Sequence, residues 1–304
     1  MIKSFTITNY LGESITLEMM RPEKSGFVIK EVQGLGPVKA NVNTSASATH
    51  DGTRFNSARA DERNIVFDLI FVETHPGELI ENIRQKSYKY FPLKREVTIA
   101  IETDNLQVQT KGYVESNEPD IFEEQEGAQI SIVCPDPYFY SKEVNVTNFY
   151  SVIPAFEFPF SNESLSEPLL EMSKINYNTG KVIVYKGHSE IGMFIKIHAV
   201  GEVKNLTIHN LGTRETMTIN TDKLAMITGS GIIARDDILI STMQGDKYIT
   251  LTRDGVGYNI LNCLDKGTAW FKLAAGDNLF AFTAEEGVTN VQFQIENQVI
   301  YEGV

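Results

Sequence analysis

Two short segments of the chain resemble motifs that carry chemistry, and each fails at a required position. Gly187-His188-Ser189-Glu190-Ile191 has the serine of a nucleophile elbow, but Ile191 stands where that sharp turn requires glycine. We therefore predict a hairpin turn there. Gly229-Ser230-Gly231-Ile232-Ile233-Ala234 fits the glycine pattern of a dinucleotide site and follows an apolar segment, 224–228. A strand-like segment, 236–241, follows it where a helix N-terminus is required, so we predict no such site.

The remaining reactive residue types show no arrangement typical of catalysis. The five histidines and two cysteines lack metal-ligand spacing, and no Ser/His/Asp set lies on a recognisable frame. Cys134 and Cys263 fall in different halves of the chain, which indicates two buried reduced thiols in a protein folded in a cytoplasm. The sequence therefore predicts no catalytic residue, no metal, no cofactor and no enzymatic activity.

Trp270 is the only tryptophan and lies in the segment Ala-Trp-Phe-Lys-Leu, 269–273. An exposed aromatic residue on a β-sandwich can stack on a sugar ring, whereas a buried one belongs to the core. The sequence favours the core and keeps Trp270 as a candidate for sugar stacking.

Length and charge exclude several other classes of function. A chain of 304 residues normally divides into two domains. The net charge of −13 argues against direct binding to nucleic acid, whose phosphates need a basic surface. No run of about 18 apolar residues is present to span a membrane, and the first residues alternate like a strand, which predicts no standard export signal.

The first half has the pattern of a β-rich domain with one helix. Strands are expected at 4–9, 15–19 and 27–32, arranged as a meander, and at 96–102, 107–116 and 129–134. The apolar segment 63–73 predicts a central strand covered on both faces. A helix is expected to start at a cap formed by Thr74-His75-Pro76-Gly77-Glu78 and to end near Tyr90.

Residues 41–61 are small and polar and have almost nothing to bury. Their two halves alternate around Asp51-Gly52, a dipeptide that suits the positive-φ turn of a hairpin. We therefore predict a long hairpin arm that needs a neighbouring surface to be ordered. The tip of this arm comprises Thr49, His50, Asp51, Gly52, Thr53, Arg54 and Phe55.

A proline-rich elbow divides the chain. The strand ending at Cys134 must stop there because Pro135 and Pro137 cannot donate to a sheet. The elbow should hold Tyr138 and Phe139, with the following tyrosine, as packing residues. We take residues 1–142 as the first domain, 143–304 as the second, and Pro135, Pro137, Tyr138 and Phe139 as the joint.

The second half consists of short apolar segments separated by turns. An edge strand is expected at 156–160 because a proline interrupts its aromatic alternation. Further turns are expected at 178–180, 186–188, 210–212 and 244–246. This spacing predicts a β-sandwich or a jelly roll, and neither needs a helix.

The order of these parts resembles the distal tail protein family of bacteriophages with long non-contractile tails. The similar features of the first half are the meander, the glycine-tipped arm, the arginine-led apolar strand, the single helix and the closing Cys134-Pro135-Asp136-Pro137-Tyr138-Phe139. Those of the second half are Met-Thr-Ile-Asn-Thr at 217–221, Trp-Phe-Lys-Leu-Ala-Ala-Gly-Asp-Asn-Leu at 270–279 and Tyr-Glu-Gly-Val at 301–304.

The resemblance implies a structural hub in the virion, made in the host cytoplasm and located at the tail tip. It implies a mainly β fold: a β-sandwich-like first domain with one helix and a hairpin arm, and a second domain similar to galectins or carbohydrate-binding modules. It also implies a ring of six copies that joins the tail tube and tape-measure protein to a tail-associated fibre or lysin, and often to receptor-binding proteins. The polar arm suits a clasp between subunits. The alternatives are a cell-wall carbohydrate-binding protein acting through its second domain and, behind it, a wall hydrolase.

Overall fold

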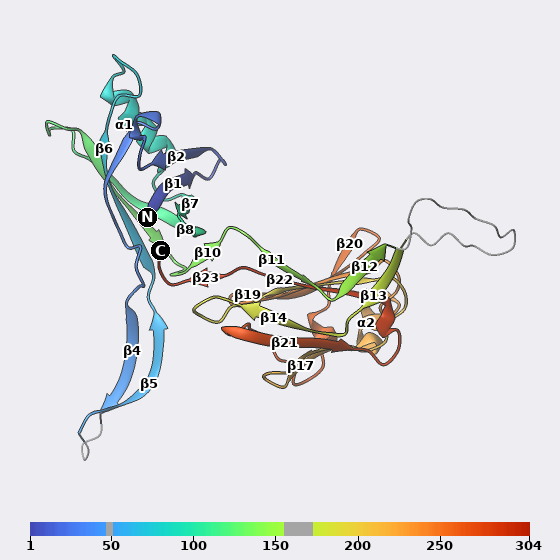
Figure 1. The fold of residues 1–304 in the computed structure, drawn as a ribbon. Coiled ribbons are helices and arrows are strands. Elements are labelled where there is room, and N and C mark those ends of the chain that lie inside the picture. Colours follow the sequence, from blue (N-terminus) through green and yellow to red (C-terminus); the bar gives the residue numbers. More distant parts are fainter. Residues whose placement is uncertain (47–50, 155–172) are drawn as a thin grey trace, which may run out of the picture. The chain divides into compact units, whose positions relative to one another are not determined.

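The structure, a computed structural model, describes residues 1–46, 51–154 and 173–304 (Figure 1). The chain forms two compact units. Unit 1 comprises Met1–Glu143 and Ile300–Val304, and unit 2 comprises Val144–Val299. Both are built mainly from antiparallel strands, so the predicted mainly β fold is confirmed.

Unit 1 is organised around one nine-stranded sheet. Its main path runs in the order β2 (Ser14–Glu18), β1 (Ile2–Thr8), β7 (Glu96–Thr103), β8 (Gln107–Pro119), β9 (Gly127–Cys134), β6 (Arg63–Phe71) and β3 (Phe27–Gln33). A short 3-10 helix, η1 (Pro22–Lys24), precedes β3. The predicted meander is wrong at its third strand, because β3 pairs with β6, placing Phe27 opposite Phe71, and not with β2.

The sheet coils around a single core. The rings of Phe5 on β1 and Phe67 on β6 meet edge to face, with their centroids 5.3 Å apart, although these strands are not neighbours in the sheet. β6 lies between β9 and β3, as its apolar sequence predicts. Its second face is only partly covered, because Asn64 is exposed and Val66 is half-buried. The expectation that both faces are covered is therefore wrong.

The helix of unit 1, α1 (Ile80–Tyr90), begins later than its expected cap. Leu79 occupies the N-cap position and makes no side-chain capping bond. Thr74 instead donates its hydroxyl to Glu78 within the preceding turn. The helix is fixed by packing, since Ile83 is fully buried in the core of unit 1.

Two short strands join the last residues of the chain to unit 1. β10 (Phe139–Ser141) pairs with β8 and with β23 (Ile300–Tyr301). Sequence alone assigns residues 300–304 to the second domain, whereas the structure places them in unit 1. The chain therefore leaves unit 1, forms unit 2 and returns.

The described part of unit 2 contains a six-stranded and a four-stranded antiparallel sheet, together with a separate two-stranded pair (Figure 1). The larger has the order β11 (Asn145–Asn148), β22 (Val291–Asn297), β15 (Phe194–Ala199), β18 (Asp237–Met243), β19 (Asp246–Arg253) and β20 (Val256–Asn259). The smaller has the order β14 (Gly180–Tyr185), β21 (Gly276–Thr283), β16 (Leu206–Asn210) and β17 (Glu215–Ile219). β12 (Tyr150–Pro154) and β13 (Ser173–Tyr177) pair with each other, and η2 (Leu261–Cys263) and η3 (Val288–Asn290) are short 3-10 helices.

Aromatic rings fill the space between the two sheets of unit 2. Phe282 on β21 stacks on Phe293 on β22 with a centroid distance of 5.0 Å, and Phe149 contacts both rings. Buried residues alternate with more exposed residues along both strands, as in a β-sandwich, and on β22 the outward residues are Gln292, Gln294 and Glu296. The predicted β-sandwich is therefore present. The edge strand expected at 156–160 lies outside the described residues.

Two local expectations for unit 2 are wrong. Residues 221–228 form a helix, α2, capped by Asn220 and ended by Gly229 at a φ of +81°, in a half of the chain where the sequence pattern calls for no helix. The segment 186–190 is not a hairpin turn, because β14 and β15 belong to different sheets. The absence of a helix after Gly231 does agree with the sequence, since β18 is the next regular element.

Candidate assembly surface

The most unusual element of unit 1 is a hairpin arm formed by β4 (Ala40–Ala46) and β5 (Thr53–Ala60) (Figure 1). All seven residues of β4 and all eight of β5 are exposed. An isolated two-stranded hairpin is only marginally stable in water, because it has no core of its own. The arm therefore has the character of a segment that needs a partner surface.

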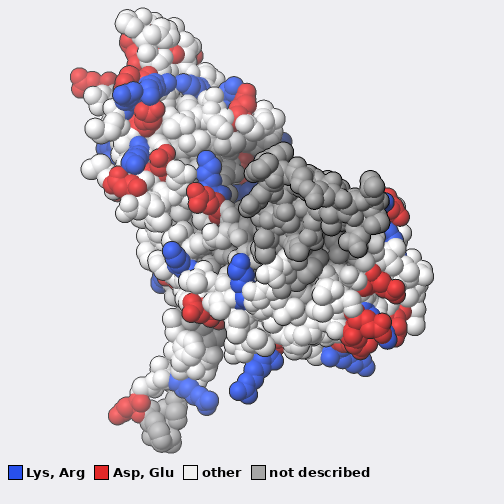
Figure 2. All heavy atoms as spheres, turned by 45° about the vertical axis from the view of Figure 1, so that its right-hand side comes forward, with Lys and Arg blue, Asp and Glu red and all other residues white. Residues whose placement is uncertain are grey.

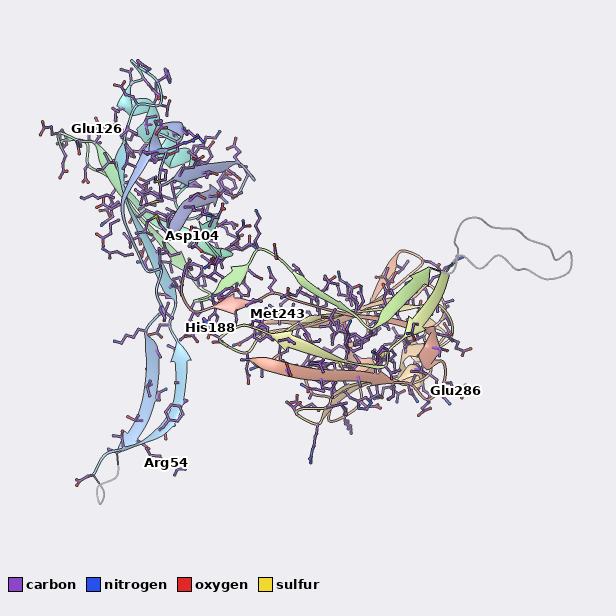
Figure 3. All side chains as sticks on the ribbon, viewed as in Figure 1. Arg54, Asp104, Glu126, His188, Met243 and Glu286 are labelled. Atoms are coloured by element: carbon purple, nitrogen blue, oxygen red, sulfur yellow. The ribbon has the colours of Figure 1, made fainter. Side chains whose placement is uncertain are left out.

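The predicted tip residues are distributed over the end of this arm. Gly52 has a φ of +91°, a value that favours glycine, and it directly precedes β5. The strand pairing ends at Ala46 and Thr53, so Asp51 and Gly52 lie at the β5 end of the connection between the strands. Thr53, Arg54 and Phe55 begin β5, and Arg54 is labelled near the far end of the arm in Figure 3. Thr49 and His50 lie outside the described residues.

The two faces of the arm differ in chemistry. On one face Ala40 and Val42 lie opposite Ala60 and Ala58. The pairing register shifts by one residue between Asn43 and Thr44, so Phe55 lies opposite Thr44 and on the same face as Val42. Val42 is 53% exposed and Phe55 62% exposed, so this face offers apolar surface that the monomer does not cover.

The opposite face of the arm is polar. Asn41 pairs with Arg59, Asn43 with Ser57, and Ser45 with Arg54. β4 contains no charged residue at all, and most of the arm is white in Figure 2. The charged residues of the two strands are Arg54 and Arg59, both on the polar face, so the arm is a two-faced ribbon with positive charge on one face in an acidic protein.

A buried arginine holds the root of the arm. Arg63 begins β6 three residues after β5 ends and is only 1% exposed. It donates to the carbonyl oxygens of Gly34 and Gly36, the latter at 2.7 Å, which lie in the segment leading into β4. It also donates to Pro137 at 2.8 Å and to Glu302 at 2.6 Å. One guanidinium thus ties together four segments that are distant in sequence.

The environment of Arg63 is built from backbone and one ring. Its guanidinium carbon lies 4.2 Å from the centroid of Phe139, a cation–π contact. Burial lowers the pKa of the arginine. Its five N–H donors, arranged in a planar fork, can serve several carbonyl oxygens at once. Gly34 has a φ of +83°, and a Cβ there would meet the carbonyl oxygen of Asn64 at 1.9 Å. The root of the arm is therefore tightly specified.

The proline elbow belongs to the same cluster. Asp136 accepts from the backbone amide of Tyr138 at 3.1 Å and from the hydroxyl of Tyr140. Phe139 is fully buried, and Tyr138 is half-buried. Pro135 is exposed and Pro137 half-buried. The aromatics thus pack on unit 1, as the sequence predicts, while the role of the elbow as a fixed joint stays a prediction.

The two cysteines are buried free thiols, which confirms the sequence prediction. Burial raises the pKa of Cys134 to about 11 and also raises the pKa of Cys263. Because the thiolate is the reactive form, neither residue is suited to nucleophilic chemistry.

Trp270 is half-buried, so it is neither a core residue nor a fully exposed platform. The ammonium group of Lys247 lies 5.7 Å from the centroid of its ring. Sugar stacking on Trp270 stays a prediction.

Arg63 is the residue that sequence reasoning did not select. The signal available was a charged residue at the head of an apolar strand, a position where burial of an arginine requires many acceptors. Its acceptors come from residues 34 to 302, and no local pattern connects them.

Clusters of side chains that could bind a metal ion are not found in the described part of the chain. No group of three or more His, Cys, Asp or Glu side chains that could hold a metal ion occurs among residues 1–46, 51–154 and 173–304. Across these same ranges, no helix is long and apolar enough to cross a membrane.

The comparisons with known proteins point to one architecture. No protein-family model matches the chain, and no curated protein matches it. The crystal structure of the SPP1 Dit protein, described as a paradigm of the hub adsorption apparatus in phages that infect Gram-positive bacteria, matches with a TM-score of 0.64 and 12% identity. The match covers 97% of this chain and 99% of that one. Two structures of the activated phage P2 baseplate, one with Ca and one with Sr, match at 13% identity with TM-scores of 0.47 and 0.46. Nearly the whole chain, in both of its units, therefore shares the fold of the SPP1 Dit protein.

Proposed function

We propose that this protein is a distal tail protein, a non-enzymatic hub at the tip of a long non-contractile phage tail. Unit 1 would assemble into a ring of six copies, with the arm as the clasp between neighbours. In that position the ring joins the tail tube and tape-measure protein to a tail-associated fibre or lysin and to receptor-binding proteins. Its location is then the virion.

The observation that carries this proposal is the exposed arm with one apolar face. An apolar surface that a monomer leaves in water marks a contact with another chain. A closed ring supplies the partner without a second gene product, because the same arm meets the same neighbouring surface in every copy. The fold shared with the SPP1 Dit protein supports this assignment, since that protein is described as part of a hub adsorption apparatus.

Electron microscopy of the purified full chain tests the proposal. We expect negative-stain images to contain closed rings with six-fold symmetry, and light scattering to show a mass that rises to a plateau with concentration. The tail-tube protein of the same phage should promote closure when rings form poorly alone. A particle that stays monomeric at every concentration, also with the tube protein present, would contradict the proposal.

A further inference from the structure

The connection between β8 and β9 presents an aromatic ring to solvent. Phe122 is fully exposed, and Ile121 beside it is also exposed. The hairpin continues up to this point, since the amide of Asp120 donates to the carbonyl of Gly127 at 3.0 Å. We call residues 120–126 the acidic tip. A large aromatic side chain held out in this way is typical of an anchor that fills a pocket on a partner.

Carboxylates surround this ring. Asp120, Glu123 and Glu124 are all exposed, and in the described parts of the chain none of them forms an ion pair. Glu126, labelled in Figure 3, closes the connection, and its carboxylate lies 3.0 Å from Arg84 on α1. The acidic tip therefore combines an apolar anchor with three unpaired carboxylates.

A second cation of unit 1 near the tip is also engaged. A hydrogen bond to Asp68, 3.1 Å away, raises the pKa of Lys30, and the charges of Glu123 and Asp120 add to this effect. Because its ammonium group is bonded to Asp68, Lys30 does not pair with the carboxylates of the tip. They remain available to a cation on another molecule.

A surface of complementary chemistry lies at the turn between β1 and β2. Tyr10 and Leu11 in this turn are exposed, as is Leu93 in the segment between α1 and β7. Lys94 and Arg95 follow Leu93, and neither of these exposed cations pairs with a carboxylate among the residues that the structure describes. We call these five residues the basic patch.

Hydrogen bonds hold the basic patch in place. The buried side chain of Asn9 donates to the carbonyl of Lys89 in the last turn of α1 at 3.2 Å and accepts from the amide of Leu11 at 3.0 Å. The guanidinium carbon of Arg95 lies 5.1 Å from the centroid of the Tyr10 ring, a cation–π contact. The two segments of the patch are therefore joined within the monomer.

The acidic tip and the basic patch project from opposite sides of unit 1 (Figure 1). One copy therefore cannot place its own tip on its own patch. We propose that the acidic tip of one copy docks on the basic patch of a second copy, with Phe122 against the apolar side chains and the carboxylates facing Lys94 and Arg95. Two different surfaces of one chain then meet head to tail, a contact that forms a ring when the rotation between copies closes. The proposal deepens the proposed ring and rests on it.

The arm is a less suitable surface for the tip. Its cations, Arg54 and Arg59, lie on the polar face, whereas Val42 and Phe55 lie on the opposite face. The acidic tip carries its ring and its carboxylates together, so it requires apolar and basic groups on one surface. The basic patch has both.

Charge reversal in the full chain tests the contact. Glu123→Lys with Glu124→Lys reverses the tip, and Lys94→Glu with Arg95→Glu reverses the patch. Each double variant should raise the concentration at half assembly, measured by light scattering, at least about 10-fold, because like charges then face each other. A chain with all four substitutions should recover assembly. Unchanged assembly in the double variants, or no recovery in the fourfold variant, would overturn the proposal.

A second set of variants tests the aromatic anchor. Phe122→Ser should also raise the concentration at half assembly about 10-fold or more. Met20→Ser is the matched control, because Met20 is another strongly exposed apolar residue of unit 1, and Glu102→Lys is the control for charge on β7. Both controls should assemble like the wild type. All these positions are exposed, so the variants should fold. Equal effects of Phe122→Ser and Met20→Ser would contradict the anchor.

The outcomes separate this contact from the proposed ring. Six-fold rings in the tip variants at the wild-type concentration would contradict only the tip contact. Association that depends on the tip but gives open chains would contradict only the closed ring, and a wild-type chain that stays monomeric would contradict both. If Phe122→Ser weakens binding of the tail-tube protein and leaves self-association unchanged, the tip serves that partner and the proposal is wrong.

Discussion

At the scale of single residues, Arg63 shows how a buried cation can organise a fold without an acidic partner. Its acceptors are four backbone carbonyls in three separate segments, and its stacking partner is Phe139. Hydrogen bonds to a charged group are stronger than neutral ones, and each carbonyl left unpaired in a buried position costs free energy. The geometry explains why the root of the arm and the returning tail are fixed together.

We expect Arg63→Lys to loosen this junction. Lysine keeps the charge but loses the planar fork, so at least one carbonyl loses its donor, at a cost of about 1 to 3 kcal/mol for each. Hydrogen exchange followed by mass spectrometry should show faster exchange at 34–37 and 300–304, including the amide of Val304, which donates to Leu35 at 3.0 Å.

Arg59→Lys is the matched control for this variant, because Arg59 is 78% exposed on the arm. It should leave exchange at both segments unchanged. Equal exchange in the wild type and in Arg63→Lys would show that the junction does not depend on the guanidinium fork.

At the scale of elements, we predict that substitutions on the two faces of the arm differ in their effect on ring closure. Val42→Asp places a carboxylate on the apolar face, and Asn43→Asp places the same group at the next position on the polar face. Both positions are exposed in the monomer, so neither should change monomer stability by more than about 0.5 kcal/mol. Burying an unpaired carboxylate in an apolar contact costs several kcal/mol, so Val42→Asp should prevent ring closure and Asn43→Asp should permit it.

The readout for these two variants is the fraction of closed rings in electron micrographs at matched concentrations. Loss of rings in Asn43→Asp with rings retained in Val42→Asp would show that the polar face makes the contact instead.

The elements also show how far the sequence alone reaches. Strands and the arm could be predicted because alternation and the Asp-Gly turn are local signals. The partner of β3 could not, because strand pairing is a property of distant segments. α2 was missed because a short apolar segment such as 224–228 fits a strand or a buried helix equally well.

The candidate site divides in the same way. The arm residues and the elbow were accessible from composition and from proline chemistry. The Arg63 cluster was not, because it gathers acceptors from segments as distant as Glu302, 239 positions along the chain. Each of its residues is ordinary in the sequence, and only the fold brings them together.

At the scale of the whole molecule, unit 2 is inserted between two paired strands of unit 1. Tyr140 on β10 lies opposite Ile300 on β23, and in unit 2 Asn145 lies opposite Asn297. The two crossing points of the chain are therefore next to each other in each unit. Insertions of this kind are tolerated because the ends of the inserted domain lie close together.

We expect unit 1 to fold when residues 144–299 are replaced by a short Gly-Ser turn between Glu143 and Ile300. The replacement converts β10 and β23 into a simple hairpin and keeps the carbonyl of Glu302 as an acceptor for Arg63. Urea unfolding followed by circular dichroism should give one cooperative transition.

Residues 1–143 alone form the control for this replacement. Without 300–304 the buried Ile300 and one acceptor of Arg63 are lost, so the free energy of unfolding should fall by about several kcal/mol. The urea midpoint should fall by that energy divided by the slope m of the unfolding free energy against urea concentration. Equal midpoints for the two proteins would show that the returning segment adds nothing to unit 1.

The return of residues 300–304 to unit 1 also sets an order of events during synthesis. The ribosome must make all of unit 2 before β23 exists, a delay on the order of ten seconds at usual translation rates. Until then Arg63 lacks one of its acceptors, and the root of the arm is not yet fixed. In a nascent or prematurely terminated chain the root of the arm is therefore not fixed, and in the proposed ring only a copy that already carries residues 300–304 would be ready to join its neighbours.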